Sequence, residues 1–575
     1  MTRLTQRPRR RRAWVLALAL AFVVVIVAML LPAAPVVVPP LEGGAPTARG
    51  AYHIHSDRSD GSGSVDQIAA AAQRAGLQFV IITDHGDGTR PPDAPQYRHG
   101  VLVIDAVELN TTKGHLVALA TPVAPYPLAG TPGDVLEDVH RLGGFGIAAH
   151  PDSPRASLRW DGWETPVDGL EWLNGDSGWR DESASWLART LLTYWFRPSG
   201  SLATLLDRPD ALLTRWDEMG LAQPLPALAG ADAHARLDLW QQTDPSPTSR
   251  SINVPGYESA FRAFSNHVVL EQPLTGDGVA DAAAVTAAIT AGRVFTVIDA
   301  LASPGGFDFT AVSVTRSVGL GDAIDLTSEV RLRARVNGPP GTTLVLLRNG
   351  QAVRETPANV IDLIATDAGV YRIEAHVPGA PGTPPVPWIL ANPIYVGLAP
   401  RVRDRPSLGL PVARIPARTG EATIEKGATD ISELVEAPLH DARDRRLAGE
   451  PPLGWRYALS TGVPAGQYAA IQLPTVGGVA GFDRVRFTVR AGAPVRAWVQ
   501  LRSGRESERW GATFYADQTA RIVDVRLSSF VPIGATSSAT PLLDRADSLL
   551  FVIDTLNSRP GASGRMTISE VGFVR

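Results

Sequence analysis

Short apolar segments alternate with helical stretches over residues 50–300, and this alternation constrains the fold more than any other feature of the chain. Residues 79–83 (FVIIT) indicate a buried strand, Ser64 to Gln67 form a capping box that begins a helix, and Thr131-Pro132 begins another. This rhythm is typical of α/β domains. It also predicts strands over 101–109, 115–120, 145–149, 169–173, 227–230 and 293–298, and a helix over 281–291.

One predicted strand ends in a histidine motif, His53-Ile54-His55, which is followed by Asp60-Gly61 in a turn. Side chains two residues apart on a strand point to the same side and lie roughly 7 Å apart, at about 3.3 Å per residue. Both imidazoles could therefore reach one metal ion.

Similar motifs recur near the ends of the other predicted strands. They contain Asp84-His85, Glu108, His115, His150, and Asp232 with His234. Active sites of α/β folds gather at the carboxyl ends of strands, so residues far apart in sequence could share one site. A lone histidine at a strand end is more often structural, but six of the 11 histidines recur in this way. The recurrence predicts a metal site.

Glu108 strengthens this prediction because it stands inside an apolar run. Burying a carboxylate costs several kcal/mol unless it is paired or binds a metal. The chain contains no cysteine, so only imidazole and carboxylate ligands are available. Such ligands suit Zn, Mn or Fe, and the sequence does not choose among these metals. The net charge of −4 argues against general nucleic-acid binding.

The amino-terminal segment predicts a membrane anchor. Arginines within residues 1–12 precede an uncharged apolar stretch over residues 13–31, which would span roughly 29 Å as a helix. The basic segment should remain cytoplasmic, which predicts a single-pass protein whose α/β domain lies outside the cytoplasm. A cleaved signal peptide is the competing interpretation. Residues 32–48 form the predicted linker to an α/β domain over residues 49–302.

The pattern changes after the α/β domain. Residues 330–336 alternate strictly, Asn349-Gly350 indicates a hairpin, and Tyr371 follows Asp367 as in the tyrosine corner of immunoglobulin-like folds. We predict a β-sandwich over residues 303–400, a proline-rich linker over 401–420, and a second β-sandwich over 421–575.

The combined motifs resemble those of the PHP (polymerase and histidinol phosphatase) family of metal-dependent phosphoesterases. The matching elements are His-x-His-(x)4-Asp-Gly, Thr-Asp-His, Glu, His, Ala-His-Pro and Gly-x-Asp-x-His, over about residues 50–300. The resemblance implies a distorted (β/α)7 TIM-like barrel that binds two or three divalent metal ions. It implies metal ligation by His53, His55, Asp60, His85, Glu108, His115, His150, Asp232 and His234.

The resemblance also assigns the ligands to individual metals. His53, His55, Glu108 and Asp232 would hold the first, and Glu108 would bridge to a second held by His115 and His150. Asp60, His85 and His234 would hold the third. We expect catalysis to depend on His53, His55, Glu108, Asp232 and His234.

The implied reaction is hydrolysis of a small phosphoester or nucleotide by a metal-bound hydroxide. Lys113 and Arg155 could contact an anionic substrate or could be solvated surface charges. Asp84 could orient His85 or only stabilise a turn.

Two further resemblances concern the β-rich regions. Residues 388–396 are similar to the end of the β-sandwich in carbaryl-hydrolase-like metallohydrolases, which leaves carbamate or carboxylester hydrolysis as an alternative activity. Residues 421–575 resemble a carbohydrate-binding or galactose-binding-like jelly roll. Trp498, Trp510 and Tyr515 could form a glycan-stacking face or belong to the core. A non-catalytic surface binding protein is the remaining alternative.

Overall fold

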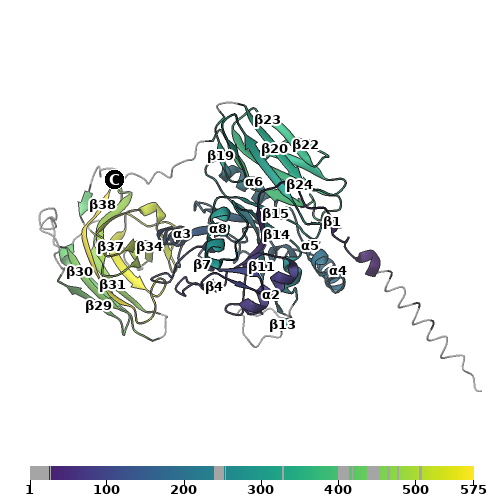
Figure 1. Cartoon of the computed structure of the whole chain (residues 1–575). Helices are drawn as coiled ribbons and strands as arrows, with labels where there is room; N and C mark the ends of the chain where they lie inside the picture. The colour runs from purple at the N-terminus through teal and green to yellow at the C-terminus, as the bar shows by residue number, and fades with distance from the viewer. Residues whose placement is uncertain are drawn as a thin grey trace, which may run out of the picture. The chain divides into compact units, whose positions relative to one another are not determined.

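The computed structural model describes Trp14, Leu18, Val25 and residues 27–238, 251–252, 254–326, 329–398, 414–416, 419–436, 452–462, 466–475, 478–503 and 508–575. The chain divides into two compact units, and Figure 1 labels many of their elements. The first comprises residues 1–86, 92–121 and 139–401. The second comprises residues 87–91, 122–138 and 402–575.

The predicted anchor at residues 13–31 and the basic segment at 1–12 lie largely outside the described residues. Within the described part of the chain, no helix has both the length and the apolar character needed to cross a bilayer. The predicted linker over residues 32–48 is partly folded. It contains β1 (Val36–Val37), which pairs in parallel with β16 (Ala302–Ser303) and so satisfies its backbone groups.

A closed barrel forms the centre of the first unit. Six of its strands run parallel in the order β9-β10-β11-β2-β3-β6. Their bounds are Phe145–Ala148, Gly169–Asn174, Ala227–Ala233, Thr47–Ile54, Phe79–Ile82 and Val101–Asp105. Three further strands that carry cluster residues are β4 (His85–Gly86), β7 (Val107–Thr111) and β8 (Gly114–Leu119). β4 pairs in parallel with β7, while β8 is antiparallel to both β7 and β9.

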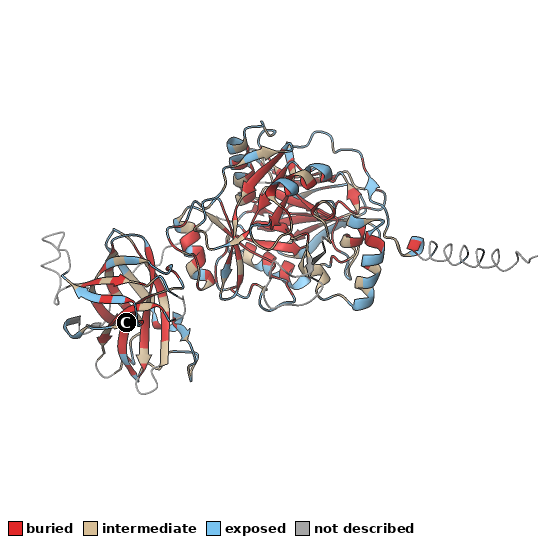
Figure 2. Cartoon of the chain, turned by 90° about the horizontal axis from the view of Figure 1, so that it is seen from below, coloured by how far each residue is buried: buried red, intermediate tan, exposed pale blue. Residues whose placement is uncertain are grey.

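The barrel strands are apolar because they are covered on both faces. Every residue of β3, β10 and β11 is buried, and the buried segments appear red in Figure 2. The helices of the predicted α/β region include α2 (Val65–Ala75), α3 (Pro132–Arg141), α7 (Tyr257–Phe261) and α8 (Gly278–Thr290). The capping box at Ser64 and Gln67 is confirmed at the start of α2.

The predicted alternation of strand and helix holds only in part. Residues 83–113 are all described and contain no helix, so the strands from β3 to β8, including β5 (Gln96–Arg98), follow one another through turns and loops. The strand predicted over residues 101–109 is divided at Ala106 into β6 and β7. Lys113 lies in a tight turn between β7 and β8, so β8 runs antiparallel to β7. His115 and Glu108 therefore lie near the starts of β8 and β7, and the expectation that each motif ends a strand is wrong for both.

Three helices that the sequence pattern did not predict follow β10. They are α4 (Ala184–Tyr194), α5 (Pro198–Ala203) and α6 (Asp210–Gly220), preceded by the short helix η1 (Ser177–Trp179). Ser183 caps α4 through a hydrogen bond from the Trp186 amide. The region after β10 supplies one side of a cavity that adjoins the end of β11.

The β-rich part of the first unit continues a sheet of the barrel. β14 (Ser265–Val269) pairs with β2 and β15 (Val294–Val297), and β15 pairs with β25 (Ile389–Ala391). β24 (Gly369–His376) then joins β25, β26 (Ile394–Val396) and β21 (Thr343–Arg348). One sheet therefore contains strands from both sides of the domain boundary predicted near residue 302. The sequence pattern changes at that boundary, but the sheet continues across it.

The second sheet of this region has the order β18-β17-β20-β23. Its bounds are Ser317–Val318, Phe307–Val312, Val330–Val336 and Val360–Ala365. The predicted alternation in β20 is confirmed, as is the hairpin turn at Asn349-Gly350, which leads into β22 (Gln351–Thr356). The Tyr371 hydroxyl donates to the Asp367 carbonyl over 2.7 Å, as expected of a tyrosine corner.

The carboxyl-terminal part of the second unit is a sandwich of two sheets with the orders β29-β30-β38-β32-β35 and β28-β31-β37-β33-β34-β36; β27 also pairs with β38. The first sheet contains Ile431–Val435, Leu453–Ala458, Ser563–Val574, Arg484–Ala491, Arg521–Arg526 and, as β27, Arg414–Pro416. The second contains Thr423–Lys426, Tyr468–Pro474, Ala546–Asp554, Val495–Ser503, Glu508–Ala516 and Val531–Ile533. Residues 401–413 of the predicted linker lie outside the described residues.

The three aromatic residues proposed for a glycan face have different surroundings. Trp510 is 1% exposed and belongs to the main core of the sandwich, so it is not available for stacking on a sugar. Trp498 is half-buried against Ala470, Leu550 and Val552, outside that core. The Tyr515 ring is half-buried, with the Arg521 guanidinium 5.4 Å from its centroid. Glycan binding stays a prediction that depends on Trp498 and Tyr515.

His267 on β14 makes acid stability a test of this fold. Its ring stacks on Phe295, its Nε2 is buried without a hydrogen-bond partner among the described residues, and burial with the Arg49 charge lowers its pKa to about 3. The unfolded chain takes up this proton near pH 6.5, whereas the folded chain takes it up only near pH 3. Its contribution to stability is therefore complete above pH 6.5 and falls by about 1.4 kcal/mol per pH unit below it.

We expect His267→Phe to reduce the loss of unfolding free energy between pH 7.5 and pH 5 by about 2 kcal/mol, since the new ring does not titrate. Chemical unfolding at both pH values, with metal removed by chelation, measures this difference. His99→Phe is the matched control because the His99 side chain is 40% exposed. An equal effect of the two substitutions would contradict the assignment.

Candidate metal centre

All nine predicted ligand side chains come together at one end of the barrel, around Glu108. Glu108 is 1% exposed, and its Oε1 lies 2.7 Å from His115 Nδ1 and 2.9 Å from His150 Nε2. Its Oε2 lies 3.2 Å from the Nε2 atoms of both His53 and His55, and 3.3 Å from His85 Nδ1. One buried carboxylate thus faces five imidazoles, two on one oxygen and three on the other.

Asp60, Asp232 and His234 complete the cluster. Asp60 Oδ2 lies 3.2 Å from His234 Nε2 and 3.7 Å from His85 Nε2. Asp232 Oδ1 lies 3.4 Å from His55 Nε2 and 3.6 Å from His53 Nε2. The rings of His55 and His234 are stacked, with centroids 4.2 Å apart. In this arrangement the Nε2 atoms of the two rings face the Asp232 and Asp60 carboxylates.

Strand order explains how these residues meet. His53 and His55 lie at the end of β2, and His85 follows β3. His150 follows β9, and Asp232 and His234 lie at the end of β11. These parallel strands end on the same side of the barrel. Since β8 is antiparallel, its first residues, including His115, lie on that side too.

The ligand atoms fall into four overlapping groups, in each of which all atoms lie within 4.8 Å of one another. The groups are His55-Asp60-His85-His234, His53-His55-Glu108, His53-His150-Asp232 and His85-Glu108-His115. His150 is thus grouped with Asp232, and His85 with His115. The assignment of each ligand to an individual ion stays a prediction.

Backbone strain marks three of these positions. His53, His150 and Asp232 have φ values of 63°, 31° and 45°, in the left-handed region that residues other than glycine rarely adopt. Such strain costs of order 1–3 kcal/mol at each residue and persists where the surroundings impose it, often at functional sites. Three strained residues in one cluster favour a functional arrangement over a structural one.

Charge in the cluster is balanced between carboxylates and imidazoles. Burial opposes ionisation of Glu108, but His53, His115 and His150 outweigh it and hold its pKa well below the ordinary value. Burial lowers the pKa of His234, whereas the Asp60 and Asp232 carboxylates raise it, to about 10. The carboxylates therefore attract positive charge to the imidazoles. A divalent cation would compete with protons for these nitrogens.

The residues fit a group of divalent ions. His55 Nε2, His85 Nδ1 and His150 Nδ1 are buried and make no well-aligned hydrogen bond to any described residue. Buried nitrogens without a well-aligned hydrogen bond are costly, and three of them in one cluster favour a metal ion as their partner. Neutral imidazole and carboxylate form the ligand set that zinc, manganese and iron accept.

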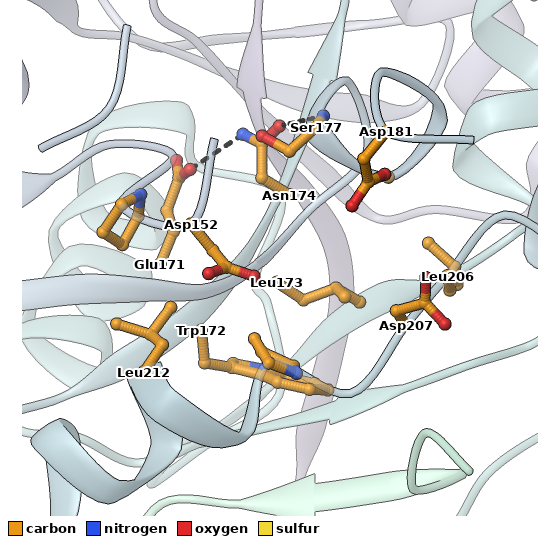
Figure 3. A pocket seen from close by; sticks show the side chains of 13 residues that line it. Asp152, Glu171, Trp172, Leu173, Asn174, Ser177, Asp181, Leu206, Asp207 and Leu212 are labelled. Carbon is orange, nitrogen blue, oxygen red and sulfur yellow. Dashed lines mark hydrogen bonds between the residues drawn. The ribbon is translucent and has the colours of Figure 1, made fainter. Parts of the chain in front are cut away.

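The sequence reasoning missed one functional residue, Glu171 on β10. It is fully buried, and its Oε1 lies 2.5 Å from His53 Nδ1. Its Oε2 accepts hydrogen bonds from the His150 amide over 2.7 Å and from Asn174 Nδ2 over 2.9 Å. Figure 3 shows the bond to Asn174 beside a small cavity of about 40 Å³. Glu171 therefore fixes the orientation of His53, as carboxylates behind metal-binding histidines commonly do.

Gly230 of β11 provides the space for Glu171. A Cβ atom at Gly230 would lie 2.6 Å from the carboxylate carbon of Glu171. Only glycine permits this approach of the two strands. The signal for Glu171 was present in the sequence, because it is a carboxylate inside a predicted apolar strand, as Glu108 is.

The remaining predicted residues lie outside the cluster. Asp84 accepts hydrogen bonds from the Ser56 amide and hydroxyl and from the Ser59 hydroxyl, and so holds the loop that carries Asp60. This favours the turn-stabilising interpretation over orientation of His85. Lys113 and Arg155 are exposed, and Lys113 pairs with Glu164. Their contact with substrate stays a prediction.

Comparison with known proteins gives distant similarities. No family model matches the chain. An uncharacterized protein of Methanocaldococcus jannaschii is 30% identical over 110 residues, which are 19% of this chain and 64% of the relative, less than two thirds of its length.

Two solved structures are similar to different parts of the chain. A two-domain protein of Bacteroides vulgatus, described as containing a predicted PHP-like metal-dependent phosphoesterase, is 15% identical with a TM-score of 0.29. The match covers 59% of this chain and 93% of that one. A family 11 carbohydrate-binding module of Clostridium thermocellum is 16% identical with a TM-score of 0.21, over 28% of this chain and 93% of the module. At these TM-scores, the function must be argued from the site itself.

Proposed function

We propose that the chain is a metal-dependent hydrolase that cleaves a small phosphoester or nucleotide. The observation that carries the proposal is the position of the buried Glu108 carboxylate, within 3.3 Å of nitrogens of five histidines. So many titratable groups would destabilise a purely structural core, because burying each of them costs free energy.

Shared ligands favour a multi-metal site. His53, His55, His85 and Glu108 each belong to two of the four ligand groups. Ions bound by such groups would be close neighbours. Neighbouring ions suit displacement at phosphorus, where they stabilise both the attacking and the leaving oxygen. Closely spaced ions therefore favour a phosphoester over a carboxylester or carbamate as the substrate.

The bound ions would supply an activated water and positive charge for the phosphate oxygens. The chain's own residues prepare this chemistry. Glu171 orients His53, Asp84 holds the loop that carries Asp60, and the strands impose the strained backbone at His150 and Asp232. Because the ligands are held before any ion binds, little reorganisation would be needed during the reaction.

A substrate panel tests the reaction class. Purified protein with added Mn²⁺ or Zn²⁺ should hydrolyse para-nitrophenyl phosphate or nucleotides faster than aryl esters. The double substitution His53→Ala and Asp232→Ala should lower turnover by about 10³-fold or more, because it removes ligands from two of the four groups. Its circular dichroism spectrum should match that of the wild type, which shows that the fold is retained.

Cleavage of esters without phosphatase activity would show that the substrate is a carbamate or carboxylester and not a phosphoester. An inactive wild-type protein with its full metal content would favour a binding protein, and unchanged turnover in the double variant would place the activity elsewhere.

We also propose that the hydrolase is anchored in a membrane with its catalytic domain outside the cytoplasm. The support is the arginine-rich segment at residues 1–12 and the apolar stretch at 13–31. In cells that express the full chain, the activity assayed above should be recovered in the membrane fraction. Activity found only in the soluble fraction would count against the anchor.

A further inference from the structure

An apolar cavity of about 320 Å³ adjoins the metal cluster in the first unit. Asp232 and His234 form part of its wall, so the cavity begins where the cluster ends. Most of the remaining wall is apolar or aromatic and comes from the region after β10 and from the loops around α7. Its apolar and aromatic side chains include Trp179, Leu187, Leu191, Tyr194, Leu205 and Phe264.

The size and composition of this cavity are those of a ligand site. Small-molecule sites commonly measure about 300–1,000 Å³ and combine apolar walls with a few polar groups. Here the charged groups of the wall are Asp176, Asp232 and Arg236, and the titratable His234 stands between the last two in sequence. A molecule that filled the cavity would place its apolar part among the α4 side chains and its polar end at the cluster.

We propose that this cavity binds the alkyl or aryl group of an amphiphilic phosphoester, which positions the phosphate at the metal cluster. The inference rests on the proposed function, which it narrows from small phosphoesters in general to those with an apolar group. In the reaction, water forms a bond to phosphorus and the bond from phosphorus to the alkoxy oxygen breaks. The alcohol leaves with one proton from the water, and inorganic phosphate is the second product.

Two adjacent leucines on α4 provide a matched test. Leu191 lines the cavity and is 46% exposed, whereas Leu192 is 43% exposed and does not line it. Successive residues of a helix point about 100° apart, so charges placed at 191 and at 192 would face different regions. Because both side chains are already half in solvent, Leu191→Asp and Leu192→Asp should fold equally well.

The probes are ethylphosphonate and octylphosphonate, which share a head group and resist hydrolysis. Isothermal titration calorimetry of the metal-loaded wild type should show octylphosphonate binding about 100-fold more tightly, since each buried methylene contributes about 0.8 kcal/mol and only part of the chain needs to be enclosed. Leu191→Asp should reduce this preference at least tenfold. Leu192→Asp should retain it.

A steady-state assay with ethyl phosphate and octyl phosphate separates this inference from the proposed function. The two alcohols are chemically similar leaving groups. A higher kcat/KM for octyl phosphate would therefore report binding of its alkyl chain in the cavity and not a difference in intrinsic reactivity. Hydrolysis of both esters at equal kcat/KM, with equal binding of the two phosphonates, would overturn the cavity while leaving the phosphoesterase intact. Selective binding of octylphosphonate without hydrolysis of either ester would overturn the proposed function alone. An equal loss of selectivity in Leu192→Asp would also overturn the cavity assignment.

Discussion

Glu108→Gln is expected to lower turnover by about 10³-fold or more and to remove at least one bound metal ion per chain. The amide keeps the shape of the carboxylate but carries no charge. It also places an NH₂ group against imidazole nitrogens that now lie 2.7–3.3 Å from the two carboxylate oxygens. The one remaining oxygen would be a neutral and weaker metal ligand, and the NH₂ group cannot bind a cation. Steady-state kinetics and metal content by inductively coupled plasma mass spectrometry measure the two effects.

The matched control for this variant is Glu271→Gln. The Glu271 side chain is 83% exposed and makes one 3.4 Å contact with Arg293, so the same change of charge there should alter neither turnover nor metal content. If Glu108→Gln retained full activity and metal content, the centre of the proposed site would be misassigned.

Glu171→Gln is expected to weaken metal binding by roughly 10–100-fold, with turnover falling in parallel at limiting metal concentration. The substituted amide could keep only part of the present hydrogen bonding. With its NH₂ group toward His53 it loses the acceptor for Nδ1, and in the other orientation it meets the donors at His150 and Asn174.

Rescue by metal distinguishes positioning from direct ligation. Turnover of Glu171→Gln should recover toward the wild-type value as Mn²⁺ or Zn²⁺ is raised, since every ligand is still present. Glu108→Gln should not recover. If both variants responded alike to added metal, or if Glu171→Gln lost activity without any change in metal affinity, the orienting role of Glu171 would be wrong.

The convergence of the nine ligands could be predicted from sequence, whereas much of their precise support could not. Motifs at predicted strand ends bring His53, His150 and Asp232 to the same side of an α/β barrel by topology alone. Their positive φ values could not be predicted, because residues other than glycine normally avoid that region. His115 was expected at the carboxyl end of a strand. It lies in the cluster because β8 is antiparallel to β7 and begins on that side of the barrel.

Long-range pairing and irregular segments account for the remaining differences. The continuation of the barrel sheet through β15 and β25 joins residues nearly 100 positions apart, and no local pattern encodes such a contact. The helices α4 to α6 carry no motif that connects them to the metal cluster, yet α4 forms a wall of the neighbouring cavity. Glu171, unlike the long-range pairing and the helices, could have been predicted. It is a carboxylate inside a predicted apolar strand, which is the feature that identified Glu108.

Metal stoichiometry tests the central claim most directly. The wild-type chain, stripped with a chelator, dialysed against Zn²⁺ or Mn²⁺ and freed of loosely bound ions, should retain two or three ions, as the overlapping ligand groups around Glu108 imply. The double variant His53→Ala and Asp232→Ala, treated identically, should retain fewer. A wild-type protein that retained no ion, or no more than this variant, would contradict the account.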